Sequence, residues 1–576
     1  MSSKRPRIVV ITLARSRDLI VGATGLQYSK LGPLREALAE AARTDETNAA
    51  RIVERFVELR PGLEDTLRAR RHHLVTGRRG AGKSTLLHVV RAHLRSIGAP
   101  VAVIDMEKFK NRPFPDVLIE ILITLLDELR PSVHFGLSVF RDLRLRKHFS
   151  GSRKELEQLL KDPQTLTKTL ERRRGSDATG RVAGSASTVV PSQAGIAQAG
   201  GSAEASRHTS ESASESAAFV EMKTERLQQL ASRLSTELLQ LVENSSSDRA
   251  LIFIDDFYYV RLQDQPAVLD YLKTVTKSTG IWLKVGGVGA RMRPFKDGDP
   301  AIGMQLNQDI DPLAIDVTLD DFGTAQRFLE RMLDGVLGPL GLTTAQLFTE
   351  TARSRMVLAC GGAVARDYIT LTAGSLDAAI ERLNKTAAPG SDTLVNIYAE
   401  DVNSAASRRM SKKEEELSLD AGEDASQLRA RWRDICDFIR EQGDTAFVLI
   451  RQKDLDEAQW GNEIRQLENL RLLHRIRDTV PNTPNWRGIK TVVYMVDLGQ
   501  LAVKRLRNGI PTFWLATIEF DKLRRAEWVY GPDWRDKLTE KRSKRKSRHS
   551  ESRNDAVSLE EQEEELLLFA DPSDLD

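Results

Sequence analysis

The stretch that decides the fold is GRRGAGKST, Gly77 to Thr85, which lies between two apolar runs. The residues from His73 to Val75 precede it and those from Leu86 to Val90 follow it, which is the pattern of a buried strand, a glycine-rich loop and a helix. Its spacing is G-x-x-x-x-G-K-[ST]. Glycines at these positions let backbone N–H groups converge on a phosphate at the start of the following helix. The stretch therefore predicts a phosphate-binding loop, or P-loop.

Two side chains of this loop have chemical roles of their own. Lys83 is expected to reach the β- and γ-phosphates of a nucleotide, and the Ser84 hydroxyl is expected to ligate magnesium. The nucleotide, which we take to be ATP with Mg²⁺, is expected to contact nine consecutive residues: Gly77, Arg78, Arg79, Gly80, Ala81, Gly82, Lys83, Ser84 and Thr85.

A second motif, ALIFIDDFYYV, covers Ala250 to Val260 and ends an apolar run in paired acids. A buried strand would place Asp255 where a carboxylate holds magnesium or its bound water. Asp256 follows at the position expected for a general base or a water-orienting acid. The two motifs therefore predict the two halves of one nucleotide site.

The organisation of the chain predicts an α/β fold with a parallel sheet flanked by helices. Apolar strand patterns recur at Val101–Phe109 and Ile281–Gly289, without alternation and separated by helical patterns. The long spacing between the two motifs is explained by residues 174–218, where Gly, Ser and Ala dominate. That composition predicts a disordered insertion.

Composition limits the alternatives. The chain has 576 residues, 40% hydrophobic and 29% charged, with a formal net charge of +3. The two cysteines, Cys360 and Cys436, are too few for a disulfide framework or a zinc site. The longest apolar run, near Val117–Leu126, is about half the ~20 residues that span a bilayer. We therefore expect a cytoplasmic protein with no membrane partner.

These motifs resemble the ATPase core of the AAA+ and STAND classes, and most closely the origin-recognition and initiator branch. FVELRPGLEDTL precedes the P-loop as the FVxR-like box of that branch does, and IWLKVGGVGARMRPF stands where the family has its sensor-1 strand. CGGAVARDYI, Cys360 to Ile369, is similar to the sensor-2 motif of a helical lid. The resemblance implies that Arg366 contacts the γ-phosphate from the lid, as a third catalytic residue beside Lys83 and Asp256.

The sequence also departs from the family pattern. Lys284 and the pair Gly286-Gly287 occupy the region where sensor 1 is usually polar, and Asp256 is one methylene shorter than the Glu of many AAA+ motors. The shorter acid favours slow turnover and a switch over a fast motor. Arg291 and Arg293 follow the sensor strand, and either is a candidate arginine finger for a neighbouring subunit or an ordinary solvated arginine.

The C-terminal third predicts a second folded unit. Short helical patterns, a helix over Glu463–Ile476 and a small β-hairpin of two extended segments, Ile489–Val503 and Pro511–Phe520, are expected here and resemble a winged helix. Arg465, Arg471, Arg475 and Arg477 would remain for solvent or phosphates, and Lys504, Arg505 and Arg507 would add to a basic surface. DNA would thus contact residues 463–507 and the tail 541–553, which carries seven Lys or Arg against one Glu. A protein-interaction role with an ordinary basic face is the alternative.

The expected domains are an N-terminal extension (1–50), a P-loop ATPase core (51–310), a helical lid (311–410), a winged-helix-like domain (425–535) after a charged linker (411–424), and a basic then acidic disordered tail (536–576). The functional hypothesis is a slowly hydrolysing ATPase that acts as a nucleotide-dependent switch for DNA binding or complex assembly, as a homo-oligomer or with a partner protein. The alternative is an ATP-bound scaffold without hydrolysis, such as a regulatory subunit of a phage-defence or mobile-element system.

Overall fold

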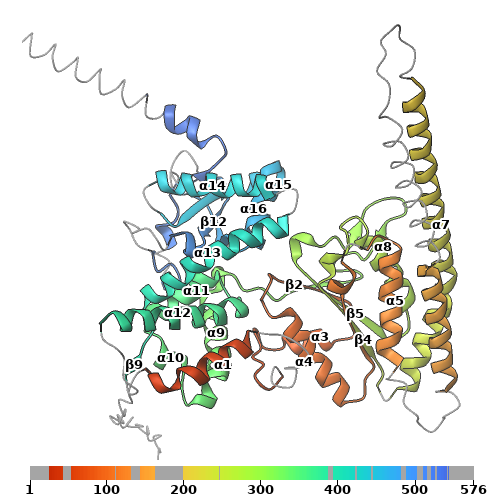
Figure 1. Ribbon diagram of the computed structural model, residues 1–576, viewed down its shortest axis with the longest axis horizontal. Helices are drawn as coiled ribbons and strands as arrows, with labels where there is room; N and C mark the ends of the chain where they lie inside the picture. Colours follow the sequence, from red (N-terminus) through yellow and green to blue (C-terminus); the bar gives the residue numbers. More distant parts are fainter. Residues whose placement is uncertain are drawn as a thin grey trace, which may run out of the picture.

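The protein is described by a computed structural model, shown in Figure 1. It describes residues 25–543 apart from these segments: 43–52, 111, 131–142, 162–198, 246, 387–392, 422–424, 443–444, 482–487, 502–509, 516–519, 526–528 and 541–542.

A five-stranded parallel sheet forms the core that carries both sequence motifs. Its strands are β2 (His73–Thr76), β3 (Val101–Asp105), β4 (Ala250–Asp255), β5 (Ile281–Gly287) and β8 (Asp311–Ala314). They lie in the order β3-β4-β5-β2-β8, and every pairing is parallel. The P-loop and the paired acids follow β2 and β4, so both lie at the carboxyl edge of the sheet, where open α/β sheets bind ligands. The predicted α/β P-loop fold is confirmed.

Helices cover both faces of this sheet, because its strands are apolar on both sides (Figure 1). Leu251 and Phe253 of β4 pack in a cluster with α4 (Lys83–Ser96) and with Leu67 of α3 (Leu63–Arg68). The alternate residues, Ile252 and Ile254, pack in a second cluster with the helices of the opposite face. Those helices are α5 (Asp116–Leu129), α7 (Ala199–Asn244), α8 (Gln265–Thr276) and a helix over residues 143–161.

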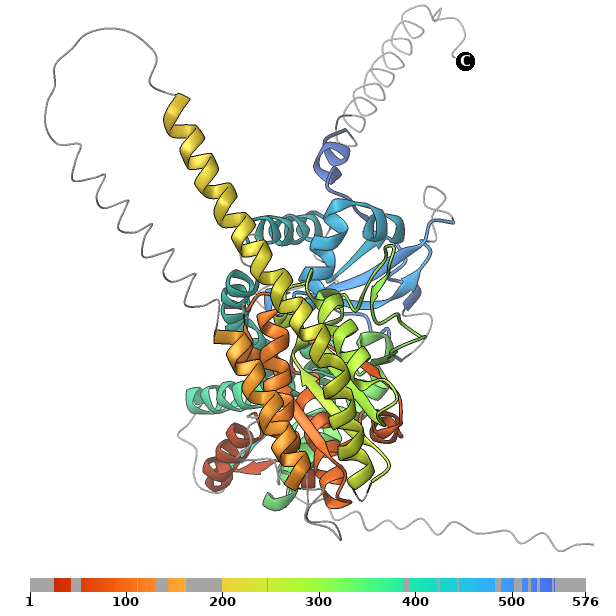
Figure 2. The ribbon, with the colours of Figure 1, turned by 90° about the vertical axis from the view of Figure 1, so that its right-hand side faces the viewer.

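Helix α7 differs from the sequence prediction. Residues 199–218, for which we predicted disorder, form the first part of α7, and residues 174–198 lie outside the described residues. Ala and Glu are good helix formers, so this segment continues the helix that Leu227–Leu241 anchor on the sheet. Figure 2 shows that α7 extends well beyond the core.

A helical lid follows β8. It contains α9 (Phe322–Leu337), α11 (Glu350–Cys360), α12 (Ala365–Thr386) and the long α13 (Ala399–Ala421). The N-terminal helix α1 (Leu31–Ala41) packs on α9 and α12 and shares their apolar cluster. Shorter elements complete this part of the chain: β1 (Leu26–Gln27) paired with β9 (Leu394–Val395), the hairpin β6 (Phe295–Lys296) and β7 (Ile302–Gly303), and α10 (Thr344–Leu347).

These contacts move two of the expected boundaries. The ATPase core extends past residue 310, since β8 (Asp311–Ala314) pairs with β2 inside the sheet. Part of the expected N-terminal extension, residues 26–41, packs on the lid through β1 and α1. β8 has only four residues, so its hydrophobic pattern is too short to be recognised as a strand from the sequence.

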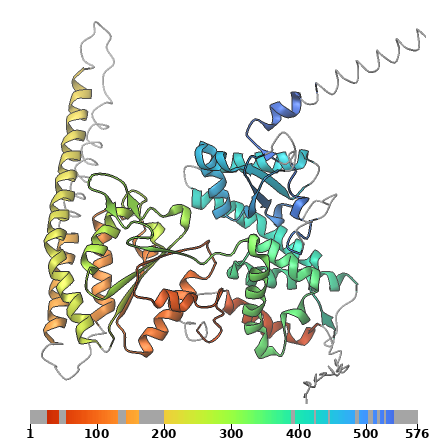
Figure 3. The same ribbon diagram turned by 180° about the vertical axis from the view of Figure 1, so that it is seen from behind.

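The C-terminal unit begins with α14 (Ala425–Glu441) and contains a four-stranded sheet in the order β11-β12-β10-β13 (Figure 3). The strands are β10 (Phe447–Arg451), β11 (Leu473–Thr479), β12 (Thr491–Val496) and β13 (Val529–Tyr530). β12 is antiparallel to both β10 and β11. Between β10 and β11 lie α15 (Gln452–Glu457) and α16 (Gln459–Asn469), and α17 (Leu498–Leu501) follows β12.

Three expectations for this part of the chain are wrong. The segment Glu463–Ile476 is not one helix, since α16 ends at Asn469 and β11 begins at Leu473. The hairpin is formed by β11 and β12, whereas residues 511–515 form no strand. The charged segment 411–424 is helical as far as Ala421, because Lys413 and Leu417 are buried on the inner side of α13.

Candidate nucleotide site

The P-loop turns back on itself at two glycines. Their backbone conformation, with positive φ, is one that only glycine adopts without strain. Gly80 has φ of 80° and Gly82 has φ of 94°, and α4 begins at the next residue, Lys83. A Cβ atom on Gly80 would lie 3.0 Å from Cβ of Arg366. The backbone amide of Arg366 also donates to the Gly80 carbonyl at 3.3 Å. The lid therefore touches the P-loop through its backbone.

The Lys83 side chain folds back onto the P-loop that precedes it. Its Nζ donates to the carbonyls of Gly77 at 2.9 Å and Arg78 at 3.2 Å. Burial lowers the pKa of this lysine, while the carboxylates of Asp256 and Asp255 act in the opposite direction. A buried ammonium among backbone carbonyls and N–H groups is suited to a phosphate, which is the role that the sequence predicts.

Asp255 and Asp256 differ in their surroundings although they are neighbours. The Asp255 carboxylate accepts the backbone N–H of Asp256 at 2.9 Å and lies against Gly286, where a Cβ atom would come within 3.1 Å of its Oδ1. Burial and the charge of Asp255 raise the pKa of Asp256 to about 6. Asp256 also has a left-handed backbone, with φ of 52°. Asp256 is thus poised to exchange a proton near neutral pH.

The cavity at the carboxyl edge of the sheet has a volume of about 450 Å³, which falls in the range of small-molecule sites. It brings together Lys83 and Ser84 of the P-loop, Asp256 after β4 and Arg366 of the lid. All of the P-loop residues from Arg79 to Thr85 line it. Gly77 and Arg78 lie beneath the cavity wall, and Asp255 lies beside Asp256 outside it.

Several residues of the cavity had no assigned role in the sequence prediction. Phe56 and Val57, from the FVELR segment, and Ile369 of α12 form an apolar part, whereas Tyr258 and Tyr259 stand beside Asp256. Glu107, after β3, adds another carboxylate, and Asp105 of the same segment pairs with Asp255 across β3 and β4. Only the FVxR-like resemblance gave a signal for Phe56 and Val57, since spacing alone does not place them beside the P-loop.

Lys284 lies midway along β5, level with the amino end of β2, and not at the carboxyl edge of the sheet. It pairs in register with His73, the first residue of β2, and it is fully buried. Its Nζ donates to the carbonyls of Ala69 at 2.8 Å and Arg71 at 2.7 Å. Burial lowers its pKa to about 7. At the carboxyl end of β5, Gly286 and Gly287 leave room for Asp255 and for Met292, and the polar sensor-1 side chain is replaced by glycine.

Arg291 and Arg293, the two candidate fingers, are exposed residues after β5. The guanidinium of Arg291 lies over the ring of Tyr258, 5.6 Å from its centroid, and the backbone of Arg293 contacts Gln265. Neither lines the cavity of its own chain.

Arg78, the second residue of the P-loop, joins the loop to the lid. It is 5% exposed, and Nε and Nη2 bind the two carboxylate oxygens of Asp316 at 2.7 and 2.9 Å. Its Nη1 donates to the Gly361 carbonyl at 2.9 Å. The ring of His474, in the C-terminal unit, packs so closely on Gly361 that a Cβ atom there would lie 1.9 Å from Nδ1. P-loop, lid and C-terminal unit therefore meet at Gly361.

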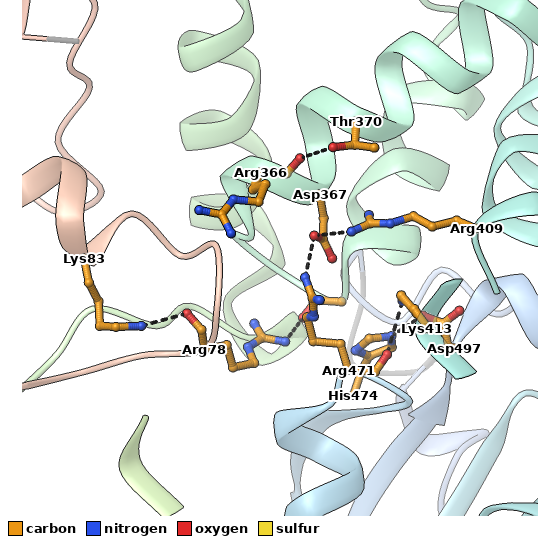
Figure 4. Close-up of polar contacts among 11 residues, drawn as sticks. Arg78, Lys83, Arg366, Asp367, Thr370, Arg409, Lys413, Arg471, His474 and Asp497 are labelled. Atoms are coloured by element: carbon orange, nitrogen blue, oxygen red, sulfur yellow. Dashed lines mark hydrogen bonds and ion pairs between the residues drawn. The ribbon is translucent and has the colours of Figure 1, made fainter. Parts of the chain in front are cut away.

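A buried cluster of charges extends this junction (Figure 4). Asp367 is fully buried and accepts from Arg409 of α13 and from Arg471 of the C-terminal unit, both at 2.5 Å. Lys413 and His474 both contact the buried Asp497. In Figure 4 the side chain of Arg366 points toward the P-loop, whereas that of Asp367 points toward Arg409 and Arg471. Consecutive residues of α12 thus connect the cavity to the C-terminal unit.

The arginines that we expected to remain for solvent or phosphates contact acids of the same chain. Arg471 is buried in the cluster, so this expectation is wrong for Arg471. The other three are partly exposed and form ion pairs: Arg465 with Asp456, Arg475 with Asp478, and Arg477 with Asp320. Lys504, Arg505 and Arg507 lie outside the described residues, as does the tail 541–553 except for residue 543.

The donors expected for magnesium fit that ion. The Ser84 hydroxyl, in the first turn of α4, and the Asp255 carboxylate, at the end of β4, are oxygen donors at the same edge of the sheet. Magnesium prefers such oxygens and completes its shell with water and substrate phosphates. Among the helices of the described residues, none has the length and hydropathy needed to traverse a bilayer.

Comparison with known proteins finds no matching family model and no matching curated sequence. Among solved structures, the chain is similar to the Orc1 protein of Aeropyrum pernix in complex with DNA, at 13% identity and a TM-score of 0.28, over 83% of this chain and 92% of that one. It is also similar to Cdc6p of Pyrobaculum aerophilum, at 12% identity and a TM-score of 0.26, over 81% and 97%.

These two proteins belong to the origin-recognition branch to which the sequence motifs were compared above. Because the TM-scores are low, the class rests on the sheet order, the P-loop and the paired acids. Those features define an α/β P-loop fold with a parallel sheet.

Proposed function

We propose that this chain binds ATP with Mg²⁺, hydrolyses it slowly and acts as a nucleotide-dependent switch. The observation that carries the proposal is the single cavity formed by Lys83 and Ser84 of the P-loop, Asp256 after β4 and Arg366 of the lid. Lys83 and Arg366 would bind phosphate oxygens, and Ser84 and Asp255 would hold the magnesium ion, which neutralises phosphate charge. Asp256 would orient water and accept its proton.

The connection from this cavity to the C-terminal unit supports the switch. Arg366 lines the cavity, and the next residue, Asp367, binds Arg471 of the C-terminal unit. A phosphate that draws Arg366 toward the P-loop would change the position of Asp367 at a junction of buried charges. Such charges tolerate few arrangements, since an uncompensated one costs several kcal/mol. Binding of ATP and release of phosphate would thus favour different positions of the C-terminal unit.

The element order of the C-terminal unit supports a winged-helix-like module. One helix (α14), one strand (β10), two helices (α15 and α16) and a hairpin (β11 and β12) follow one another. In a winged helix, the second of the two consecutive helices enters the major groove of DNA. That helix would be α16, which contacts the η6 turn (Gly289–Arg291) of the ATPase core. We propose that DNA engagement or complex assembly requires α16 to leave this contact.

The alternative, an ATP-bound scaffold without turnover, also has support. The basic residues near α16 are paired with acids of the same chain, which favours a protein-interaction role over DNA binding.

A steady-state ATPase assay with and without duplex DNA, together with ATP affinity, separates the two functions. The switch predicts measurable turnover that Asp256→Asn abolishes while ATP still binds, and a C-terminal unit that becomes more sensitive to protease when ATP is exchanged for ADP. Tight ATP binding without turnover, with an unchanged protease pattern, would support the scaffold. Loss of ATP binding in Lys83→Ala is the control for both.

A further inference from the structure

A carboxylate reaches the nucleotide cavity from the strand next to that of Asp256. Glu107 lies in the turn η3 (Met106–Phe109) that follows β3, and Asp256 directly follows β4. β3 and β4 are neighbours in the sheet, and their last residues, Asp105 and Asp255, are paired in register. Both Glu107 and Asp256 line the cavity. Because neighbouring strands lie about 4.8 Å apart, the two acids enter the cavity from adjacent strand ends.

The turn that carries Glu107 is held in place on both sides. The Asp105 carboxylate accepts the backbone N–H of Glu107 at 3.0 Å and so caps η3. Met106, between them, is fully buried in the apolar core on one face of the sheet. Burial is the main cause of the raised pKa of Asp256, and the charges of Asp255 and Asp105 add to it. The last of these contributions shows that the ends of β3 and β4 lie close together.

The Glu107 carboxylate itself is available for a ligand. The side chain is exposed, and it makes no hydrogen bond or ion pair with any residue that the structure describes. In the same part of the chain, no three acidic, histidine or cysteine side chains converge closely enough to hold a metal ion, so Glu107 does not form such a group with Asp255 and Asp256. A carboxylate accepts hydrogen bonds and repels phosphate, so the ligand that suits Glu107 here is a water molecule.

We propose that Glu107 is a catalytic residue whose carboxylate, together with that of Asp256, binds the water that attacks ATP. The inference rests on the ATPase function proposed above. Asp256 has a short side chain, and Glu107 supplies a longer one from the neighbouring strand. Water has two O–H groups, so each of the two carboxylates accepts one of them. Two acceptors fix the direction of the water lone pair, which a single acceptor leaves free to rotate.

The reaction that Glu107 would assist is hydrolysis of ATP to ADP and inorganic phosphate. The oxygen of water forms a bond to the γ-phosphorus while the bond from that phosphorus to the β,γ-bridging oxygen breaks, and the electron pair of the broken bond stays with ADP. One proton of the attacking water passes to the Asp256 carboxylate and from there to solvent. Glu107 keeps its hydrogen bond to the other O–H group and neither gains nor loses a proton.

The test compares Glu107→Gln and Glu107→Asp with Glu36→Gln. Glu36 is the matched control, because it is an exposed glutamate of α1 that lies outside the cavity. Glu107→Gln keeps the size of the side chain and removes its charge, and it is expected to lower kcat about 100-fold with little change in KM. Glu107→Asp restores part of kcat, since a carboxylate is still present. Glu36→Gln resembles the unaltered protein.

Two further measurements locate the effect on the water. Calorimetry gives the affinities for ADP and for ADP with aluminium fluoride, which mimics the transferring phosphoryl group. Glu107→Gln is expected to lose most of the gain in affinity that aluminium fluoride provides, with an unchanged affinity for ADP. The double variant with Asp256→Asn is expected to be about as slow as the slower single variant, because residues that act on one water do not have additive effects.

Three outcomes overturn the proposal. In the first, Glu107→Gln keeps its kcat and its affinity for ADP with aluminium fluoride. In the second, its turnover is restored by raising the magnesium concentration, which would make Glu107 a metal ligand. In the third, it loses affinity for ADP and for the analogue equally and melts at a lower temperature, which identifies a structural role. These outcomes leave the ATPase function intact, whereas an unaltered protein without turnover removes that function and the role of Glu107 together.

Discussion

The nucleotide cavity and the buried charge cluster both contain several cations, but these cations bind different groups. In the cluster, Arg409 and Arg471 share the carboxylate of Asp367, and Lys413 is paired with Asp497. In the cavity, the Lys83 ammonium binds the backbone carbonyls of Gly77 and Arg78, which are uncharged groups. The cations of the cluster bind carboxylates, whereas the Lys83 ammonium binds uncharged carbonyls and is suited to receive a phosphate. The first region thus holds parts of the chain together, and the second is the region for which we propose phosphate binding.

The largest expected effect comes from breaking the cluster. Arg408 and Arg409 are consecutive on α13, but the Arg408–Glu381 pair is exposed, whereas Arg409 binds the fully buried Asp367. Arg409→Ala leaves a buried carboxylate with one partner fewer and is expected to cost about 3 kcal/mol of unfolding free energy. Arg408→Ala, the matched control, is expected to cost less than about 1 kcal/mol. Urea denaturation measures both free energies of unfolding. Equal losses in the two variants would show that the buried ion pair contributes no more stability than the exposed one.

The next effect concerns the cavity. Lys83→Ala removes the buried ammonium from the centre of the P-loop and is expected to weaken ATP binding about 100-fold, since charge-assisted bonds to phosphate are lost. The free energy of unfolding without nucleotide should change much less than the affinity. Calorimetric titration with ATP and a thermal melt give the two quantities. If Lys83→Ala bound ATP with normal affinity, the phosphates would have to bind at a different place in the protein.

A smaller effect, of opposite sign, is expected at Asp256. Its folded pKa is about 6, above its ordinary value of 3.8, so the ionised carboxylate is disfavoured in the folded state and destabilises the fold above pH 6. Asp256→Asn removes this cost and is expected to stabilise the nucleotide-free protein by about 1 kcal/mol at pH 7.5. The gain should shrink at pH 5, where Asp256 is mostly protonated. Thermal melts at both pH values test this, and a loss of stability at pH 7.5 would contradict it.

The same carboxyl group predicts the pH dependence of turnover. A base must be ionised to accept a proton, so kcat/KM, which reports the free enzyme, should rise with pH through about 6 and then level off. In Asp256→Glu the midpoint should shift, because the longer side chain places the carboxyl group in different surroundings. A profile that is flat between pH 5 and 7 would remove Asp256 from the role of base.

The sequence predicted the parts of the site that depend on short spacing. GRRGAGKST and LIFIDD each combine a strand, a turn and the chemical groups in a few residues, so local periodicity suffices to recognise them. Lys284 shows where this reasoning failed. It falls in the stretch expected to hold sensor 1, but the register of β5 against β2 places it opposite His73, at the amino end of β2. Register depends on the neighbouring strand, which no local pattern contains.

The sequence by itself thus determined the fold class and the position of the P-loop between strand and helix, because both depend on residues close together in the chain. Only the tertiary structure decided which distant residues meet there. It placed Arg366 and Phe56 beside the P-loop, directed Arg78 to Asp316 and Arg79 to the tyrosines, and buried Arg471 at the junction where the sequence had expected it to remain for solvent or phosphates. The reason is physical: the surroundings of a charge depend on the acids and apolar surfaces that the fold brings to it from other parts of the chain.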